Sequence, residues 1–266
     1  MNVLNWLLRK LRRVPKYIPV NRLESLLEDA ARDPAKRPEF FRTLFHFRLF
    51  ALGSMKEEKD GSKAVGFETS QWKGESFIYA YTSEEALRWQ VAKEGQSKDF
   101  VALSASDLFG MLNGKLGIYL NSGHDFGKYF TAFEVKEVLA GIDLEKAQHT
   151  IKEGSTIALG QPKDRPHALI DSLSKYSKRT PFIKDLYFGQ LAHEDGLLEY
   201  LGVIYFDGPV SQQKEDLVVK DLMMIVKEMP ELGQPMSFTT NREDNSFQDA
   251  IERDSLRSVY SEMAEN

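Results

Sequence analysis

Apolar residues recur at two spacings along this chain, and the two spacings predict helices alternating with strands. Residues 21–31 carry leucine or alanine at every third or fourth position, which is the period of a helix with one buried face. Asn21 and Glu24 stand at its start in a variant of the capping box. Residues 47–52 alternate between the two sides of an expected strand, and the charged, glycine-containing stretch 53–63 is expected to be a loop.

Turn and cap signals place further elements before residue 141. A hairpin is predicted at 65–82 around Trp72-Lys73-Gly74, because glycine favours a tight turn. More helices are predicted near Pro38 and after Ser83, Ser104 and Thr131, and short strands at 100–103 and 116–120. A turn is expected at 121–124. Strands that alternate with capped helices indicate layered α/β or α+β structure.

The second half of the chain shows a simpler order of elements. The predicted elements are a strand at 156–159, a helix at 166–177, a hairpin of strands 183–192 and 197–206, a helix at 216–229 and a strand at 236–239. This is the ferredoxin-like order β-α-β-β-α-β. The expected fold class is therefore α+β, with mixed α/β layers in two domains, 16–141 and 155–240, joined by a polar connector.

The ends of the chain carry opposite charge. Residues 1–22 hold six basic residues and no acidic one, whereas the acidic tail 241–266 holds three basic and seven acidic residues. The net charge of the whole chain is −5, so the part after residue 22 is strongly acidic. An acidic body is poorly suited to phosphate contacts, and we therefore expect no nucleic-acid partner. The tail is predicted to form one more helix around Phe247 and Ile251, or to stay loose.

Residues 1–15 predict a short basic amphipathic helix. Its apolar stripe is Leu4, Leu7, Leu8 and Leu11 with Trp6 beside it, and its basic residues are Arg9, Lys10, Arg12 and Arg13. Such a helix packs on its own domain, binds in the groove of a partner protein or lies on an anionic membrane surface. We favour its own domain, then a partner, and expect the membrane surface least. The apolar residues precede the basic ones, the reverse of a secretory signal.

Composition limits the chemistry further. The chain has 266 residues and a mass of 30.4 kDa, which exceeds one typical domain. It contains no cysteine, which excludes disulfides, thiolate zinc sites and cysteine nucleophiles. No apolar run approaches the roughly 20 residues that cross a bilayer. With no cysteine and no export signal, we expect the protein to be cytoplasmic.

Motifs for catalysis or metal binding are weak. Gly123-His-Asp-Phe-Gly127-Lys128 resembles a shortened phosphate loop, but it has three residues between its glycines where a Walker loop has four. A structural turn is the favoured interpretation. His193 is expected at the solvated tip of a hairpin, and no histidine has a partner at metal-ligand spacing. We therefore expect no metal, no cofactor and no catalytic residue.

Four stretches of the first domain resemble the enhanced serine sensitivity (SseB) family of bacterial proteins. They are Tyr17-Ile-Pro-Val-Asn-Arg-Leu-Glu24, Phe40-Phe-Arg-Thr-Leu44, Tyr81-Thr-Ser-Glu-Glu85, and Leu120-Asn-Ser-Gly123 with Gly127-Lys128. The remainder from Thr156 is similar to the C-terminal domain of that family. Two positions depart from the family pattern, since Tyr81 stands for phenylalanine and Ser122 for proline. The shared residues are typical of turns and caps.

The resemblance implies a cytoplasmic bacterial protein linked by name to serine sensitivity, without an established reaction. The leading hypothesis is a non-enzymatic protein that binds an unidentified protein and modulates amino-acid metabolism. Its candidate contacts are the basic segment with Trp6, Arg9, Lys10, Arg12 and Arg13, and the Tyr205–Pro209 region, including Tyr205 itself.

Two other hypotheses remain open. The first is an amino-acid sensor or an unrecognised enzyme, with a site where strand ends meet helix starts. Its candidate residues are Thr82, Ser83, Asn121, Gly123, Gly127 and Lys128. The second is a membrane-surface adaptor that binds through residues 1–15.

Overall fold

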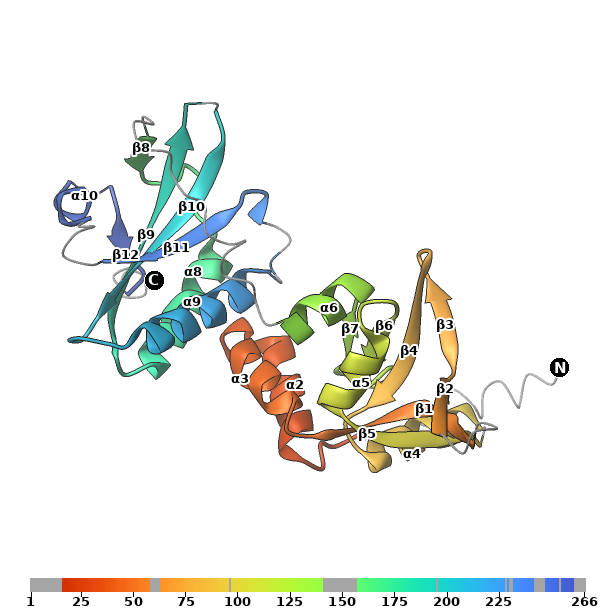
Figure 1. Ribbon diagram of the computed structural model, residues 1–266. Helices are drawn as coiled ribbons and strands as arrows, with labels where there is room; N and C mark the ends of the chain where they lie inside the picture. The colour runs from red at the N-terminus through yellow and green to blue at the C-terminus, as the bar shows by residue number, and fades with distance from the viewer. Residues whose placement is uncertain are drawn as a thin grey trace, which may run out of the picture. The chain divides into compact units, whose positions relative to one another are not determined.

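The computed structural model describes residues 16–57, 63–95, 97–140, 157–194, 196–227, 229, 232–241, 247–253 and 255–260. They form two compact units, one built from residues before Arg32 together with 40–141, the other from 32–39 and the residues after 141. Each unit combines a sheet with helices (Figure 1). The predicted class, two-domain α+β, is confirmed. The short segment 32–39 belongs to the second unit, although in sequence it stands within the stretch assigned to the first domain.

The first unit has a sheet with helices on both faces. Its elements are α2 (Arg22–Arg32), α3 (Arg37–Leu44), β1 (Arg48–Glu57), β2 (Lys63–Phe67), β3 (Thr69–Trp72), β4 (Glu75–Tyr81), α4 (Glu84–Glu94), β5 (Phe100–Ser104), α5 (Ala105–Leu112), β6 (Gly117–Leu120), β7 (Lys128–Phe130) and α6 (Ala132–Ala140). β1 pairs antiparallel with β4 and β5, β4 runs parallel to β6, and β6 pairs antiparallel with β7.

Caps fix where these helices begin, as the sequence predicts. Ser83 and Ser104 accept hydrogen bonds from the backbone of the first turns of α4 and α5. Thr131 and Glu134 form a reciprocal capping box at α6, with N–H···O distances of 3.1 and 2.8 Å. Gly95 ends α4 in a left-handed conformation with φ 69°.

The predicted loop at 53–63 is wrong for residues 53–57, which continue β1. Ala51 is the last residue of β1 that pairs with β4, and from Gly53 on β1 pairs with β2 instead. β3 then pairs with the first half of β4, so the predicted strand 65–70 divides between two partners. Gly53 adopts φ 152°, and a Cβ there would stand 2.4 Å from the carbonyl oxygen of Gly66. The glycine therefore lets the backbones of β1 and β2 approach closely at this point. The composition of the segment alone suggests a loop.

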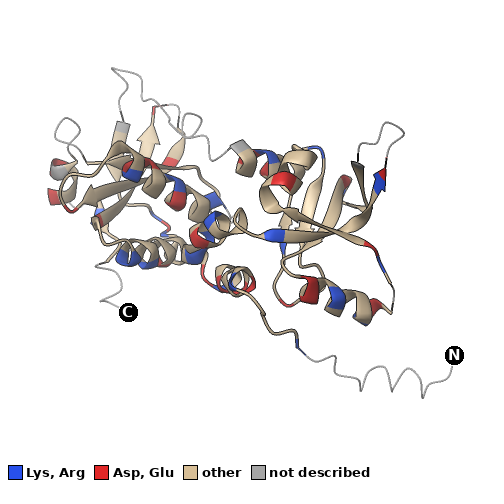
Figure 2. Cartoon of the chain, turned by 60° about the horizontal axis from the view of Figure 1, so that its bottom comes forward, with Lys and Arg blue, Asp and Glu red and all other residues tan. Residues whose placement is uncertain are grey.

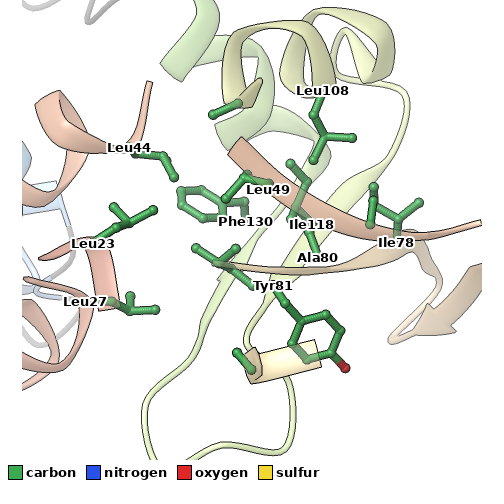
Figure 3. Close-up of a cluster of buried hydrophobic side chains, with 14 of the residues drawn as sticks. Leu23, Leu27, Leu44, Leu49, Ile78, Ala80, Tyr81, Leu108, Ile118 and Phe130 are labelled. Atoms are coloured by element: carbon green, nitrogen blue, oxygen red, sulfur yellow. The ribbon is translucent and has the colours of Figure 1, made fainter. Parts of the chain in front are cut away.

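The two faces of this sheet differ in character. Aliphatic side chains of β1, β4 and β6 point to the face that α2, α5 and α6 cover, and they form the core drawn in Figure 3. Leu49, Ile78, Ile118 and Phe130 are all at most 1% exposed there. The opposite face carries aromatic side chains, and α4 covers the end that includes Tyr81, which is 3% exposed.

The second unit follows the predicted order β-α-β-β-α-β. Its elements are β8 (Ile157–Gly160), α8 (His167–Arg179), β9 (Ile183–His193), β10 (Leu198–Phe206), α9 (Gln212–Lys227) and β11 (Met236–Thr240), followed by α10 (Gln248–Glu252) and β12 (Arg257–Ser258); η1 (Pro34–Lys36) packs with them. The strand pairing differs from the ferredoxin-like arrangement. β8 lies antiparallel beside β9, whereas a split βαβ unit would place another strand between them. Element order does not determine pairing, so the sequence could not show this.

The C-terminal segment covers the second face of this sheet. α8 and α9 pack on one face, and Phe247, Ile251 and Leu256 pack against Leu201 and Val203 on the other. β12 pairs with β9, and Ser258 Oγ donates a hydrogen bond of 2.6 Å to Asp185. The described part of the acidic tail is therefore ordered, and it includes the predicted helix.

The close approach of β1 and β2 at Gly53 can be tested directly. Gly53→Ala should lower the free energy of unfolding by about 1–3 kcal/mol, because its Cβ meets backbone that cannot move aside. Gly110→Ala is the matched control, since Gly110 lies inside α5 with no atom within 4 Å of a new Cβ. It should stabilise the protein by ~0.5–1 kcal/mol. Urea unfolding followed by circular dichroism measures the free energy of unfolding of both variants. Equal changes in the two variants would contradict the close approach at Gly53.

Candidate functional site

Three of the predicted ligand residues meet at the carboxyl ends of β4 and β6. Thr82 and Ser83 follow β4, and Asn121 follows the parallel strand β6. Open α/β sheets commonly bind ligands at this edge. Here, however, Thr82, Ser83 and Asn121 are only 1, 5 and 0% exposed.

Asn121 ties the two strand ends together. It occupies the left-handed region with φ 52°, which asparagine tolerates better than most residues. Its Oδ1 accepts a hydrogen bond of 2.9 Å from the backbone N–H of Thr82, and its Nδ2 donates one of 2.8 Å to the Thr82 hydroxyl. The side chain amide is thus committed to holding the neighbouring strand.

Glu24 provides the acceptor at the centre of this network. It lies in the first turn of α2 and is completely buried. Its carboxylate accepts hydrogen bonds from the hydroxyls of Tyr17 at 3.0 Å, Thr82 at 3.1 Å and Ser83, and from the backbone N–H of Val20 at 2.7 Å. Asn21 caps α2 by accepting from the Glu24 backbone at 2.9 Å, which confirms the predicted cap. Its amide also donates to the Thr82 carbonyl at 3.1 Å.

The carboxylate of Glu24 stands where an external anion would otherwise bind. The start of α4 carries the partial positive charge of a helix N-terminus, and Ser83 is its N-cap. The Ser83 hydroxyl also contacts the Tyr17 hydroxyl at 3.2 Å, so residues 17–24 cover the start of α4. A ligand at Thr82, Ser83 and Asn121 would have to displace the chain's own carboxylate.

His124 and Gly123 lie beside the hydrogen-bond network around Glu24. The His124 ring packs edge-on against Tyr17 with centroids 4.6 Å apart, and its Nε2 lies 3.0 Å from the Ala86 carbonyl. Burial is the main cause that lowers the pKa of His124 below its usual value. Gly123 adopts φ 82° directly against the side chain of Gln90.

Gly127 and Lys128 stand apart from this network. Gly127 packs against the carbonyl oxygens of Leu120 and Asn121 at a turn. The Lys128 ammonium pairs with Glu134 at 3.3 Å and lies over the ring of Phe130. The segment is a structural turn, which is the interpretation that the sequence favours.

The predicted partner-binding residues fall in two places. Trp6, Arg9, Lys10, Arg12 and Arg13 lie outside the described residues. Tyr205 is half-buried in the cluster beneath the C-terminal segment, where its ring meets Tyr187 at 5.2 Å. It is therefore part of the packing of the second unit.

His193 ends β9 at the hairpin, as predicted, but its side chain is only 23% exposed, so the expected solvation is only partial. Its Nε2 lies 3.2 Å from the carboxylate of Glu199, which is only 3% exposed and also accepts from Ser237. Glu199 lies six residues further on, across the hairpin on β10, and Ser237 comes from β11. Among the residues that the structure describes, no three His, Cys, Asp or Glu side chains gather as a metal site.

An aromatic surface that the sequence analysis missed lies on the outer face of the first sheet. Strand register places the side chains of β3, β4, β6 and β7 on the same side. We call this group the aromatic face: Trp72, Phe77, Tyr79, Tyr119 and Tyr129. Trp72 is 53% exposed, and the three tyrosines are half-buried. The residues alternate along each strand, but only the pairing of four strands brings them together.

Edge-to-face contacts hold the aromatic face in one arrangement. Tyr129 meets Trp72 at 5.4 Å and Phe77 at 5.6 Å, while Tyr79 stacks on Tyr119 at 6.3 Å. Burial and a hydrogen bond to Glu75 raise the pKa of Tyr129 to about 12. These rings are preorganised on rigid strands, a property that favours binding.

Comparison with known proteins gives matches over both units. The model of the SseB protein N-terminal domain matches residues 23–137, and that of the SseB protein C-terminal domain matches residues 151–257. Protein SseB of Escherichia coli (strain K12) and Protein SseB of Shigella flexneri are each 31% identical over 169 residues. The matched part is 62% of this chain and 64% of each relative. No solved structure gives a significant match. Within the described chain, no helix is both long and apolar enough to cross a membrane.

Removing the central carboxylate should destabilise the first unit. Glu24→Ala leaves the hydroxyls of Tyr17, Thr82 and Ser83 without their acceptor, and we expect the free energy of unfolding to fall by at least ~2 kcal/mol. Asp29→Ala, at an exposed position of the same helix, should change it by less than ~0.5 kcal/mol. Urea unfolding checks both variants, and a small effect of Glu24→Ala would show that the network is not structural.

His124 should make stability depend on pH. Its folded pKa is lower than the unfolded value, so its contribution is complete above about pH 6.5 and is lost as the pH falls below that value. His124→Phe keeps a ring against Tyr17 and does not titrate, and its free energy of unfolding should fall less between pH 7 and pH 5. Urea unfolding at several pH values compares the two slopes, and parallel curves would contradict the expectation.

Proposed function

Since this chain belongs to the SseB family, we propose that it is a non-enzymatic cytoplasmic protein that acts by binding other proteins. We further propose that this binding modulates amino-acid metabolism, as the name enhanced serine sensitivity suggests. The single observation that carries the proposal is the exposed aromatic face of the first unit. Tyrosine and tryptophan are enriched at protein interfaces and in their energetic hot spots.

Three features support binding by this face. Trp72 projects from the β3–β4 hairpin with more than half of its surface exposed. Phe77 at the centre is 4% exposed and supports the neighbouring rings from below. The tyrosine hydroxyls can bind water while the aromatic face is exposed. The rings can lose that water when a partner covers the face.

The amino-acid sensor or enzyme has less support. Its predicted residues Thr82, Ser83 and Asn121 are closed by the Glu24 network, and Lys128 is committed to Glu134. A hollow of about 580 Å³ lies elsewhere, along β5 and residues Gly53–Met55. Those residues include none of the predicted ligand contacts. A membrane adaptor would depend on residues 1–15, which lie outside the described part.

Capture from a native lysate tests the proposal. The full tagged chain should retain a protein partner that is lost when Trp72→Ser and Tyr119→Ser are combined. Phe133→Ser is the matched control, because Phe133 is 65% exposed but lies on α6, which packs on the other face of the sheet. Quantitative mass spectrometry reads the bound proteins.

The same variants separate binding from an indirect effect in cells. In a strain that lacks the gene, the original chain and Phe133→Ser should restore growth with added serine, whereas the double variant should not. If the double variant retains all its partners and restores growth, the aromatic face does not carry the function. Circular dichroism confirms that each variant is folded.

A further inference from the structure

The aromatic face carries one cation and one anion side by side. Trp72 and Glu75 are directly opposite each other in the β3–β4 register, and Lys73 lies at the turn between them. The Lys73 ammonium stands 4.6 Å from the centre of the Trp72 ring, and Glu75 accepts a hydrogen bond of 3.0 Å from Tyr129. Opposite charges therefore border the most exposed ring of the face.

The charges near Trp72 favour neither a strongly acidic nor a strongly basic partner. Lys73 and Glu75 cancel, and most of the sheet of the first unit is drawn without charged positions in Figure 2. Single-stranded nucleic acid would need basic residues between the exposed rings. A two-fold axis that passes between Lys73 and Glu75 would, however, bring each Lys73 opposite the Glu75 of the other copy.

We propose that the aromatic face pairs with the aromatic face of a second copy of this chain, about a two-fold axis close to Trp72. This inference rests on the proposed function, because it names the partner of the same surface. The two Trp72 rings meet near the axis, and two identical Lys73–Glu75 pairs flank them. Tyr119 and Tyr129 extend the contact on each side.

The backbone of β6 supports this geometry. Gly117 lies beside Phe77 and Tyr129, and a Cβ there would stand 2.6 Å from the carbonyl oxygen of Phe130, 3.2 Å from the Tyr129 hydroxyl and 3.4 Å from Phe77 Cβ. The missing side chain lets the rings lie low on the sheet, so the face stays shallow enough for another sheet to approach. Two sheets that pack face to face need only about 10 Å between them.

The size of the face predicts weak association. An aromatic side chain buries roughly 150–250 Å² when fully covered, and these rings are already partly covered. The area lost per copy is therefore on the order of 500 Å², at the low end for specific interfaces, and a dissociation constant in the micromolar range is expected.

Charge reversal provides the decisive test on the purified full chain. Sedimentation equilibrium should show a reversible monomer–dimer equilibrium that Trp72→Ser weakens at least tenfold and Phe133→Ser leaves unchanged. Lys73→Glu alone and Glu75→Lys alone should each weaken the dimer, because each places like charges together twice. The double variant K73E/E75K should restore it, because every pair then has opposite charges again.

Each result bears on one proposal or the other. A chain that stays monomeric up to about millimolar concentration overturns the self-association, and so does a dimer that Trp72→Ser, Lys73→Glu and Glu75→Lys all leave unchanged. If the monomeric chain nevertheless captures a different protein through Trp72, self-association fails while the proposed function stands. If the charge swap restores the dimer but no variant changes growth with serine, the interface is correct and the proposed function fails.

Discussion

The buried carboxylate of Glu24 is the constraint on which the first unit depends. A charged group without solvent is tolerated only where hydrogen bonds replace the lost water. Four donors from two separate segments meet this requirement: Tyr17 and Val20 before α2, and Thr82 and Ser83 where β4 leads into α4. Because each donor must lie within hydrogen-bonding distance, one side chain fixes the relative positions of the extended segment before α2, the end of β4 and the start of α4.

This constraint also decides where function can lie. The carboxyl ends of parallel strands and the start of a helix would normally form a site for a small anion. Here the chain fills that site with its own acid, so the chemistry of Thr82, Ser83 and Asn121 is used to hold the fold. The aromatic residues gather on the outer face of the same sheet, beyond the part that α4 covers.

The sequence predicted local structure well because caps and turns are local. Ser83, Ser104 and Thr131 begin helices where expected, since each cap bonds within three residues of itself. Thr82, Ser83 and Asn121 were also correctly grouped, because parallel strand ends share one edge. Their role was not predictable, because Glu24 approaches them from 58 residues away. The close contact at Gly53 and the pairing of β8 likewise depend on strand register, and the contact of His193 with Glu199 depends on the pairing across the β9–β10 hairpin.

The aromatic face shows the same limit and also explains the composition of the sheet. Along any one strand, the residues of the aromatic face are simply every second residue. Nothing in that alternation shows which side of the strand faces the core and which side faces water. Register resolves this, because Ile78 and Ala80 face Ile118 and Leu120 beneath the helices, while Tyr79 lies beside Tyr119 on the other side. Aliphatic residues suit a face that is permanently covered. Tyrosine and tryptophan suit a face that is covered only part of the time, since they combine a large apolar area with a group that water can satisfy. The division of residue types between the two faces of one sheet is therefore itself an argument that the outer face is used for reversible contact.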